Sequence, residues 1–201
     1  MTTRVLVSLV LSVVAGATAL GQEPHANHTV PTPARHASAA PLYSDGDLMF
    51  LTDMVAHHQQ ALDMASLVAS RSSREELLKF ARYLAGVQHA EIDHMKALLN
   101  AAAERGQSVP AHETNGDPPM RGMLSKGSIA ALEAAVGQNF EKLWLQGMIQ
   151  HHQGAIDMAL AQQQHEFEAR RQPYGIAAIA DDILASQRAE IGMMRTWLAR
   201  W

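Results

Sequence analysis

The chain carries an internal repeat, and this repeat constrains the fold more than any other feature of the sequence. Residues 54–65 read Met-Val-Ala-His-His-Gln-Gln-Ala-Leu-Asp-Met-Ala, and residues 148–159 are identical to them at eight of twelve positions. Residues 88–95 and 187–194 are identical at five of eight positions. The offsets are 94 and 99 residues, so the same two segments recur in the same order. We therefore predict two copies of one structural unit.

Each copy has the pattern of a helical hairpin. Apolar residues recur at helical spacing, and serines followed three residues later by an acid suggest capping boxes at Ser44 with Asp47 and at Ser73 with Glu76. The expected helices cover residues 45–70, 73–105 and 138–168 and the stretch from 175 to the C-terminus, with a short helix near 128–135.

Two hairpins that each expose one apolar face can bury both faces by packing together. The predicted fold is therefore all-α, a ferritin-like four-helix bundle built from two repeated hairpins. The predicted domain covers residues 44–201, as repeat one (44–105), a long crossover (106–137) and repeat two (138–201).

The N-terminal segment has the three parts of a secretory signal peptide. A basic residue, Arg4, precedes an apolar run, and small residues follow up to Gly21. Residues 1–21 are therefore predicted to be a signal peptide, and the Pro- and His-rich residues 22–43 a flexible leader. No second apolar stretch approaches the roughly 20 residues of a membrane span, so we expect a periplasmic or secreted protein without membrane insertion of the mature chain.

Composition narrows the chemistry. The sequence has 11 Met, 11 His and no Cys, which excludes disulfides, thiol catalysis, Cys-ligated zinc and iron–sulfur clusters. The net charge of −4 argues against a nucleic-acid binder that works by neutralising phosphates. No Gly-x-Ser-x-Gly elbow indicates nucleophilic catalysis. The sequence leaves enzymatic activity open and favours a protein that is not an enzyme.

Polar and sulfur-containing side chains share the inner faces of the predicted helices. A turn of about 100° per residue puts His57 and His58 on either side of the apolar stripe that contains Met54. On the following helix Gln88, Glu91 and Met95 share one face, so the inner polar groups of both helices are expected to meet near Met54. Burying polar groups without partners costs about 1–3 kcal/mol each. Their presence in both copies therefore calls for a function.

Metal binding is the chemistry that fits. Imidazole binds copper, zinc, iron and nickel, and the soft thioether of Met selects copper, so copper, as Cu(I) or Cu(II), fits better than iron or zinc. The predicted ligands are Met54, His57, His58, Glu91 and Met95, with Met148, His151, His152, Glu190 and Met194 in the second copy. Metal binding by Asp47 and Glu141, by Met120 and Met123, or by His25 and His28 stays open.

The pattern M-x-x-H-H-Q-x-A-x-D-M-A followed by Q-x-x-E-I-x-x-M resembles an exported bacterial family of unknown function, the family of the copper-resistance protein CopM. The resemblance spans about residues 44–201. It implies a ferritin-like fold and a periplasmic copper-binding protein of metal homeostasis. It also implies the paired histidines and the Met one turn before each pair as ligands, with Met64 and Met158 behind them.

Two alternatives stay open beside copper binding. Glu91-x-x-His94 has the spacing of a di-metal oxidase ligand pair. Against an oxidase, Met193 replaces His94 in the second copy, and no inward Glu is expected near the paired histidines of either first helix. The other alternative is an interaction module in which His and Met only pack. Expected partners are the metal ion and other copper-handling proteins, and the oligomeric state is open.

Overall fold

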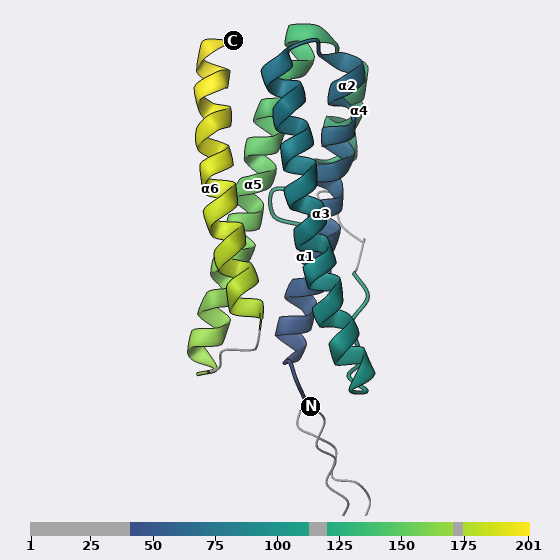
Figure 1. The fold of residues 1–201 in the computed structure, drawn as a ribbon, viewed down its shortest axis with the longest axis vertical. Helices are drawn as coiled ribbons and strands as arrows, with labels where there is room; N and C mark the ends of the chain where they lie inside the picture. Colours follow the sequence, from purple (N-terminus) through teal and green to yellow (C-terminus); the bar gives the residue numbers. More distant parts are fainter. Residues whose placement is uncertain (1–40, 113–119, 171–174) are drawn as a thin grey trace, which may run out of the picture. The chain divides into compact units, whose positions relative to one another are not determined.

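The predicted all-α fold is confirmed. The computed structural model describes residues 41–112, 120–170 and 175–201, and every regular element in these ranges is a helix. The predicted signal peptide and the leader up to residue 40 lie outside the described residues. The helices are α1 (Asp45–Ser66), α2 (Val68–Arg71), α3 (Glu75–Glu104), α4 (Lys126–Ala134), α5 (Gly137–Glu168) and α6 (Ile176–Arg200) (Figure 1).

The four long helices form the bundle as two hairpins. Helix α1 packs along α3, and α5 packs along α6, as the neighbouring ribbons in Figure 1 show. The hairpins meet mainly where α1 contacts α5. The short helix α4 lies in the crossover and contacts α5. None of the helices within the described ranges is long and apolar enough to cross a membrane.

Helix α1 begins at its predicted cap. The Ser44 side chain accepts a hydrogen bond from the Asp47 backbone N–H, and the Asp47 carboxylate accepts one from the Ser44 N–H. The helix was expected to continue to residue 70 but is interrupted at Leu67. The Trp144 indole Nε1 donates to the Met64 carbonyl oxygen at 2.9 Å. A donor inserted into the helical hydrogen-bond ladder is a known cause of such a break.

The capping box predicted at Ser73 is wrong. Helix α3 begins at Glu75 and its N-cap is Arg74, whose side chain makes no capping hydrogen bond. The Ser72 hydroxyl oxygen instead accepts from the Arg74 N–H at 3.0 Å and its hydrogen is donated to Glu141 at 2.6 Å. Ser72 thus ties the turn of the first hairpin to α5.

The described part of the chain includes residues before Ser44. Tyr43, near the end of the predicted leader, is only 1% exposed. The Gln107 amide oxygen accepts from the Leu42 and Tyr43 N–H groups, and its Nε2 donates back to the Tyr43 carbonyl. Residues 42 and 43 are therefore fixed against the segment that follows α3.

The two hairpins are related by an approximate two-fold axis. Helices α1 and α5 run antiparallel, because residues early in one contact residues late in the other. Asp47 accepts from Gln162, and Glu141, the counterpart of Asp47, accepts from Ser72. At the midpoint of this antiparallel contact the rings of His57 and His151 lie 3.8 Å apart. The repeat in the sequence therefore becomes a symmetric contact whose centre is a pair of imidazoles.

Candidate metal centre

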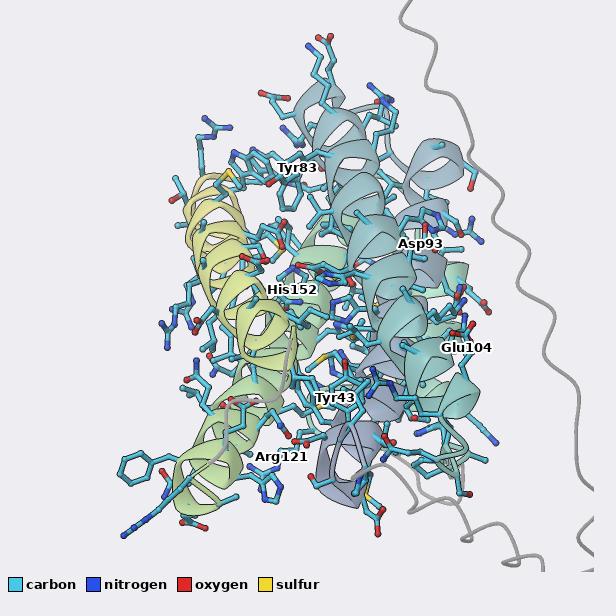
Figure 2. All side chains as sticks on the ribbon, turned by 60° about the horizontal axis from the view of Figure 1, so that its bottom comes forward. Tyr43, Tyr83, Asp93, Glu104, Arg121 and His152 are labelled. Carbon is cyan, nitrogen blue, oxygen red and sulfur yellow. The ribbon has the colours of Figure 1, made fainter. Side chains whose placement is uncertain are left out.

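Four histidines lie at the centre of the bundle and are fully buried. His57 and His58 come from α1 and His151 and His152 from α5, and each is 0% exposed. Figure 2 shows His152 among the side chains between the helices. The ring centroids are 6.4 Å apart within the first pair and 6.2 Å apart within the second. The repeat thus brings together, at the centre of the bundle, all the imidazoles that are buried within the described residues.

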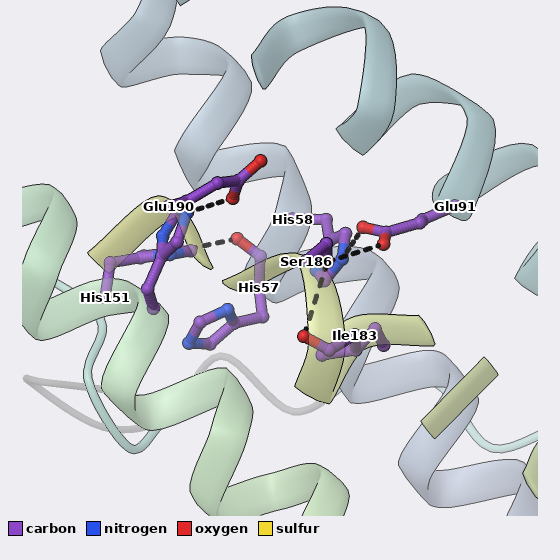
Figure 3. Close-up of polar contacts among 8 residues, drawn as sticks. His57, His58, Glu91, His151, Ile183, Ser186 and Glu190 are labelled. Atoms are coloured by element: carbon purple, nitrogen blue, oxygen red, sulfur yellow. Dashed lines mark hydrogen bonds and ion pairs between the residues drawn. The ribbon is translucent and has the colours of Figure 1, made fainter. Parts of the chain in front are cut away.

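One histidine of each pair is held by a carboxylate from the partner helix of its hairpin. His58 Nε2 donates to Glu91 Oε2 at 2.8 Å, and His152 Nε2 donates to Glu190 Oε2 at 2.7 Å (Figure 3). The expectation that no inward Glu lies near the paired histidines is therefore wrong. The predicted burial of Glu190 with the histidines is realised, since Glu190 is 1% exposed.

The other histidine of each pair is held by a backbone carbonyl. His151 Nε2 donates to the His57 carbonyl oxygen at 2.9 Å, a contact drawn in Figure 3. His57 Nε2 donates to the Arg121 carbonyl oxygen at 3.0 Å. Because a carbonyl oxygen only accepts, both rings carry their proton on Nε2.

All four Nδ1 atoms consequently carry a lone pair and lie inside the protein. Each is buried, and none has a hydrogen-bond partner among the described residues. A neutral imidazole whose N–H is bonded to a carboxylate or a carbonyl, with the opposite nitrogen free, is the arrangement of a metal-binding histidine. Among buried polar atoms, such unpartnered groups are the exception, and a bound ion is one of the groups that can satisfy them.

Burial keeps the two central rings neutral. Burial, and to a smaller extent the neighbouring His58, lowers the pKa of His57 from 6.5 to about 3. Burial, followed by His57, also holds the pKa of His151 well below its usual value. Since metal ions bind the unprotonated ring, both nitrogens are available without loss of a proton.

Two more polar groups without partners belong to the same interior. The amides of Gln88 on α3 and Gln187 on α6 are buried, and neither their oxygen nor their nitrogen has a partner in the described part of the chain. The Oε1 atom of Glu190 is also unpartnered there. The interior thus holds polar atoms from all four long helices.

The predicted methionine ligands divide into two groups. Five are fully buried, at 0% exposure: Met54, Met64, Met95, Met148 and Met194. The sixth, Met158, is only partly buried and lines a surface cavity that also contains Arg121. Met64 packs instead beside Gly147 of α5. The two copies therefore differ at this position, although their sequences are identical there.

Carboxylates elsewhere on the inner stripe have structural roles. Glu141 Oε2 accepts from Arg74 at 2.9 Å in addition to the Ser72 contact. Asp47 caps α1 and accepts from Gln162. Within the described ranges no three His, Asp or Glu side chains are grouped so that they could hold one metal ion. His94, of the Glu-x-x-His spacing, is exposed on α3.

Residues 120–125, which we call the crossover segment, make contacts with the site that the sequence did not predict. The Arg121 carbonyl binds His57, and Gln60 exchanges two hydrogen bonds with the backbone of Leu124, at 2.8 and 3.1 Å. In the second copy Gly154 replaces Gln60, and a Cβ there would lie 2.0 Å from the Arg121 carbonyl oxygen. The difference between the repeats at this position was the sequence signal that could have indicated these contacts.

Comparisons with known proteins agree with the fold. The profile of a family described as a domain of unknown function (DUF305) matches residues 47–198. Among curated proteins none shows significant similarity.

Solved structures of the same kind resemble the chain over most of its length. A DUF305 protein from Streptomyces coelicolor is 30% identical with a TM-score of 0.66, and covers 79% of this chain and 95% of its own. A DUF305 fragment from Deinococcus radiodurans is 29% identical with a TM-score of 0.67, over 79% and 98%. CopM, in a structure described as the Cu(I)-bound form, is 30% identical with a TM-score of 0.59, over 79% and 98%. Further structures of CopM are described as Cu(II)-bound and Ag-bound. The chain belongs to the DUF305 family, which includes CopM.

Proposed function

We propose that this protein binds copper in the centre of its helical bundle and serves to sequester or hand over the ion. The observation that carries the proposal is the set of four buried Nδ1 lone pairs without partners among the described residues. Their tautomers are fixed by Nε2 hydrogen bonds, so the free nitrogen of each ring is defined before an ion arrives.

The side chains around these nitrogens favour copper over harder ions. Met54 and Met148 are buried, and each precedes its histidine pair by one helical turn. Thioether sulfur is a soft donor that selects Cu(I), and imidazole binds either copper oxidation state. The structures of CopM with Cu(I), Cu(II) and Ag support the same ion class for this chain.

Different residues have different roles in the proposed centre. In each repeat the donors are the Nδ1 atoms of the histidine pair and the sulfur of the Met one turn before it, Met54 or Met148. Met95 and Met194, which follow Glu91 and Glu190 by four residues, add thioethers on α3 and α6. Glu91 and Glu190 orient the histidines through Nε2. Met64 lies behind the donors, and Met158 is outside the centre.

The proposed role is exercised outside the cytoplasm. Residues 1–21 have the sequence of a signal peptide, and Met and His bind copper without the oxidation that exported thiols undergo. Other copper-handling proteins are the expected partners for delivery. No step of turnover is needed for this role.

The test is a Cu(I) titration under anaerobic conditions, with a chromophoric chelator as competitor. We expect tight binding, and the part of it that is due to the buried centre should be lost in a variant with His57, His58, His151 and His152 all changed to Gln. The matched control changes two exposed histidines of α3, His89→Gln and His94→Gln, and should bind as the parent does. Circular dichroism verifies that each variant remains helical.

Three outcomes would contradict the proposal. Full Cu(I) binding by a folded four-histidine variant would show that the buried rings are not ligands. Iron binding accompanied by oxygen consumption would instead support a ferritin-like di-metal oxidase. If neither copper nor iron is bound, the protein is an interaction module whose histidines only pack.

A further inference from the structure

A second group of soft-metal donors lies at the surface, apart from the buried histidines. A cavity of about 350 Å³ is lined by residues of α1 and by the chain on both sides of residues 113–119. The lining residues that matter are Met49, Thr52, Asp53, His112 and Met120. None of them belongs to the centre described above.

His112 is prepared as a ligand in the same way as the buried histidines. Its Nδ1 lies 2.9 Å from Asp53 Oδ1, and because a carboxylate only accepts, Nδ1 carries the proton. In this tautomer Nε2 is the ring nitrogen that carries the lone pair. The side chains of His112 and Asp53 are 18% and 31% exposed, so water and small ions can reach this nitrogen.

Two thioethers line the same cavity. Met49 is 54% exposed, among the most exposed of the large hydrophobic side chains in the described residues, and Met120 is half-buried. The buried hydroxyl oxygen of Thr52 has no partner in the described part of the chain. Imidazole and two thioethers form a donor set for a soft monovalent ion. Asp53 has no counterpart in the second repeat, where Gly147 stands, so this group of residues occurs once.

We propose that this cavity is a second, solvent-accessible site for a soft monovalent cation such as Cu(I). The ligands are the sulfurs of Met49 and Met120 and Nε2 of His112, and Asp53 orients the imidazole. All of these donors differ from those of the buried centre. The two sites can therefore be tested, and can fail, separately.

The experiment uses Ag(I) as a redox-stable probe of protein labelled with ¹³C in the methionine methyl groups. We expect the Met49 and Met120 signals to shift on addition of Ag(I). Met193, which is 41% exposed on α6, should not shift and serves as the matched control. Zn(II) at the same concentration should leave all three signals in place, because thioether is a poor ligand for it.

Variants then assign the bound ion. Met49→Leu combined with Met120→Leu nearly conserves side-chain volume and should abolish one bound Ag(I), whereas Met193→Leu should not. His112→Asn should also abolish it. In the four-histidine variant described above, binding at this cavity should persist. Unchanged Ag(I) binding in the Met49/Met120 double variant, or unmoved Met49 and Met120 signals, would overturn this inference and leave the buried centre unaffected.

Discussion

Glu91 and Glu190 occupy equivalent places in the two repeats but have different surroundings. Glu190 is 1% exposed, and its second carboxylate oxygen has no partner in the described residues. Glu91 is 14% exposed, and its second oxygen accepts from Ser186 at 3.4 Å, a contact drawn in Figure 3. A carboxylate excluded from water acts more strongly on the histidine it holds.

This difference predicts unequal effects of the same substitution. Glu190→Gln should weaken Cu(I) binding by about 10–100-fold, the usual effect of removing such an orienting partner. Glu91→Gln should weaken it less, because water can replace a partly exposed carboxylate. Competition with a chromophoric chelator measures both affinities. Glu75→Gln, in an exposed surface pair with Lys79, is the control. Equal affinities for Glu190→Gln and the parent would show that the Glu190–His152 contact has no part in metal binding.

Among the structural elements, the crossover segment is the one that the repeat does not account for. It passes over α5 where Gly122, with φ +77°, meets Gly154 with no room for a side chain on either. Its backbone at Leu124 is held by Gln60, and its Arg121 carbonyl by His57. Gln60 and Gly154, which occupy equivalent positions of the two repeats, are thus both contacted by this segment.

Gly154→Ala should therefore destabilise the protein. The new Cβ would lie within 2.6 Å of backbone atoms of Arg121 and Gly122, so the segment must move and the Arg121–His57 contact is lost. We expect a loss of about 1–3 kcal/mol in the free energy of unfolding, measured with urea. Gly192→Ala is the matched control, because nothing lies within 4 Å of its added Cβ; on a helix it should stabilise by up to about 1 kcal/mol. Equal stabilities of the two variants would contradict the close packing.

In the molecule as a whole, the two hairpins meet through a pair of uncharged imidazoles. The pKa of His57 is lowered to about 3 and that of His151 is also lowered, in both cases first by burial, while the unfolded chain titrates near 6.5. Between these pH values the unfolded state binds more protons than the folded state. Stability from both rings is therefore fully present above pH 6.5 and is lost as the pH falls.

The metal-free protein should consequently unfold more easily in mild acid. Each ring contributes a slope of up to about 1.4 kcal/mol per pH unit in this range. Glu166 opposes this loss of stability at lower pH, because its pKa is raised, mainly by burial. Urea unfolding between pH 7.5 and 4.5 measures the slope. His57→Gln should reduce this slope, whatever the free energy of unfolding of the variant at pH 7.5. An unchanged slope in that variant would mean that His57 is protonated in the folded state.

Much of this architecture could be predicted from the sequence, because periodicity and repetition report directly on helices and their inner faces. The helical stripe correctly placed His58 and Glu91 in the same interior. Glu91 was expected to lie near Met54, and in the structure it contacts His58, one helical turn further along α1. The metal-ligand roles stay predictions.

Long-range contacts set the limits of that prediction. The break at Leu67 depends on an indole that is 80 residues away in the sequence. Met158 was expected to match Met64, yet it faces a surface cavity. The Arg121 carbonyl could not be found from side-chain chemistry at all, because any residue supplies the same oxygen.

A single chain with two repeats cannot keep its halves alike. Two separate hairpins paired as a homodimer would present identical central histidines and bind two ions with one affinity. Here one linker serves two repeats, so His57 is bonded to the linker while His151 is bonded to the backbone of His57. Covalent joining of the halves thus makes the two proposed ion sites inequivalent. Successive ions should bind with different affinities and be released in a set order, a behaviour that a symmetric dimer could reach only through cooperativity.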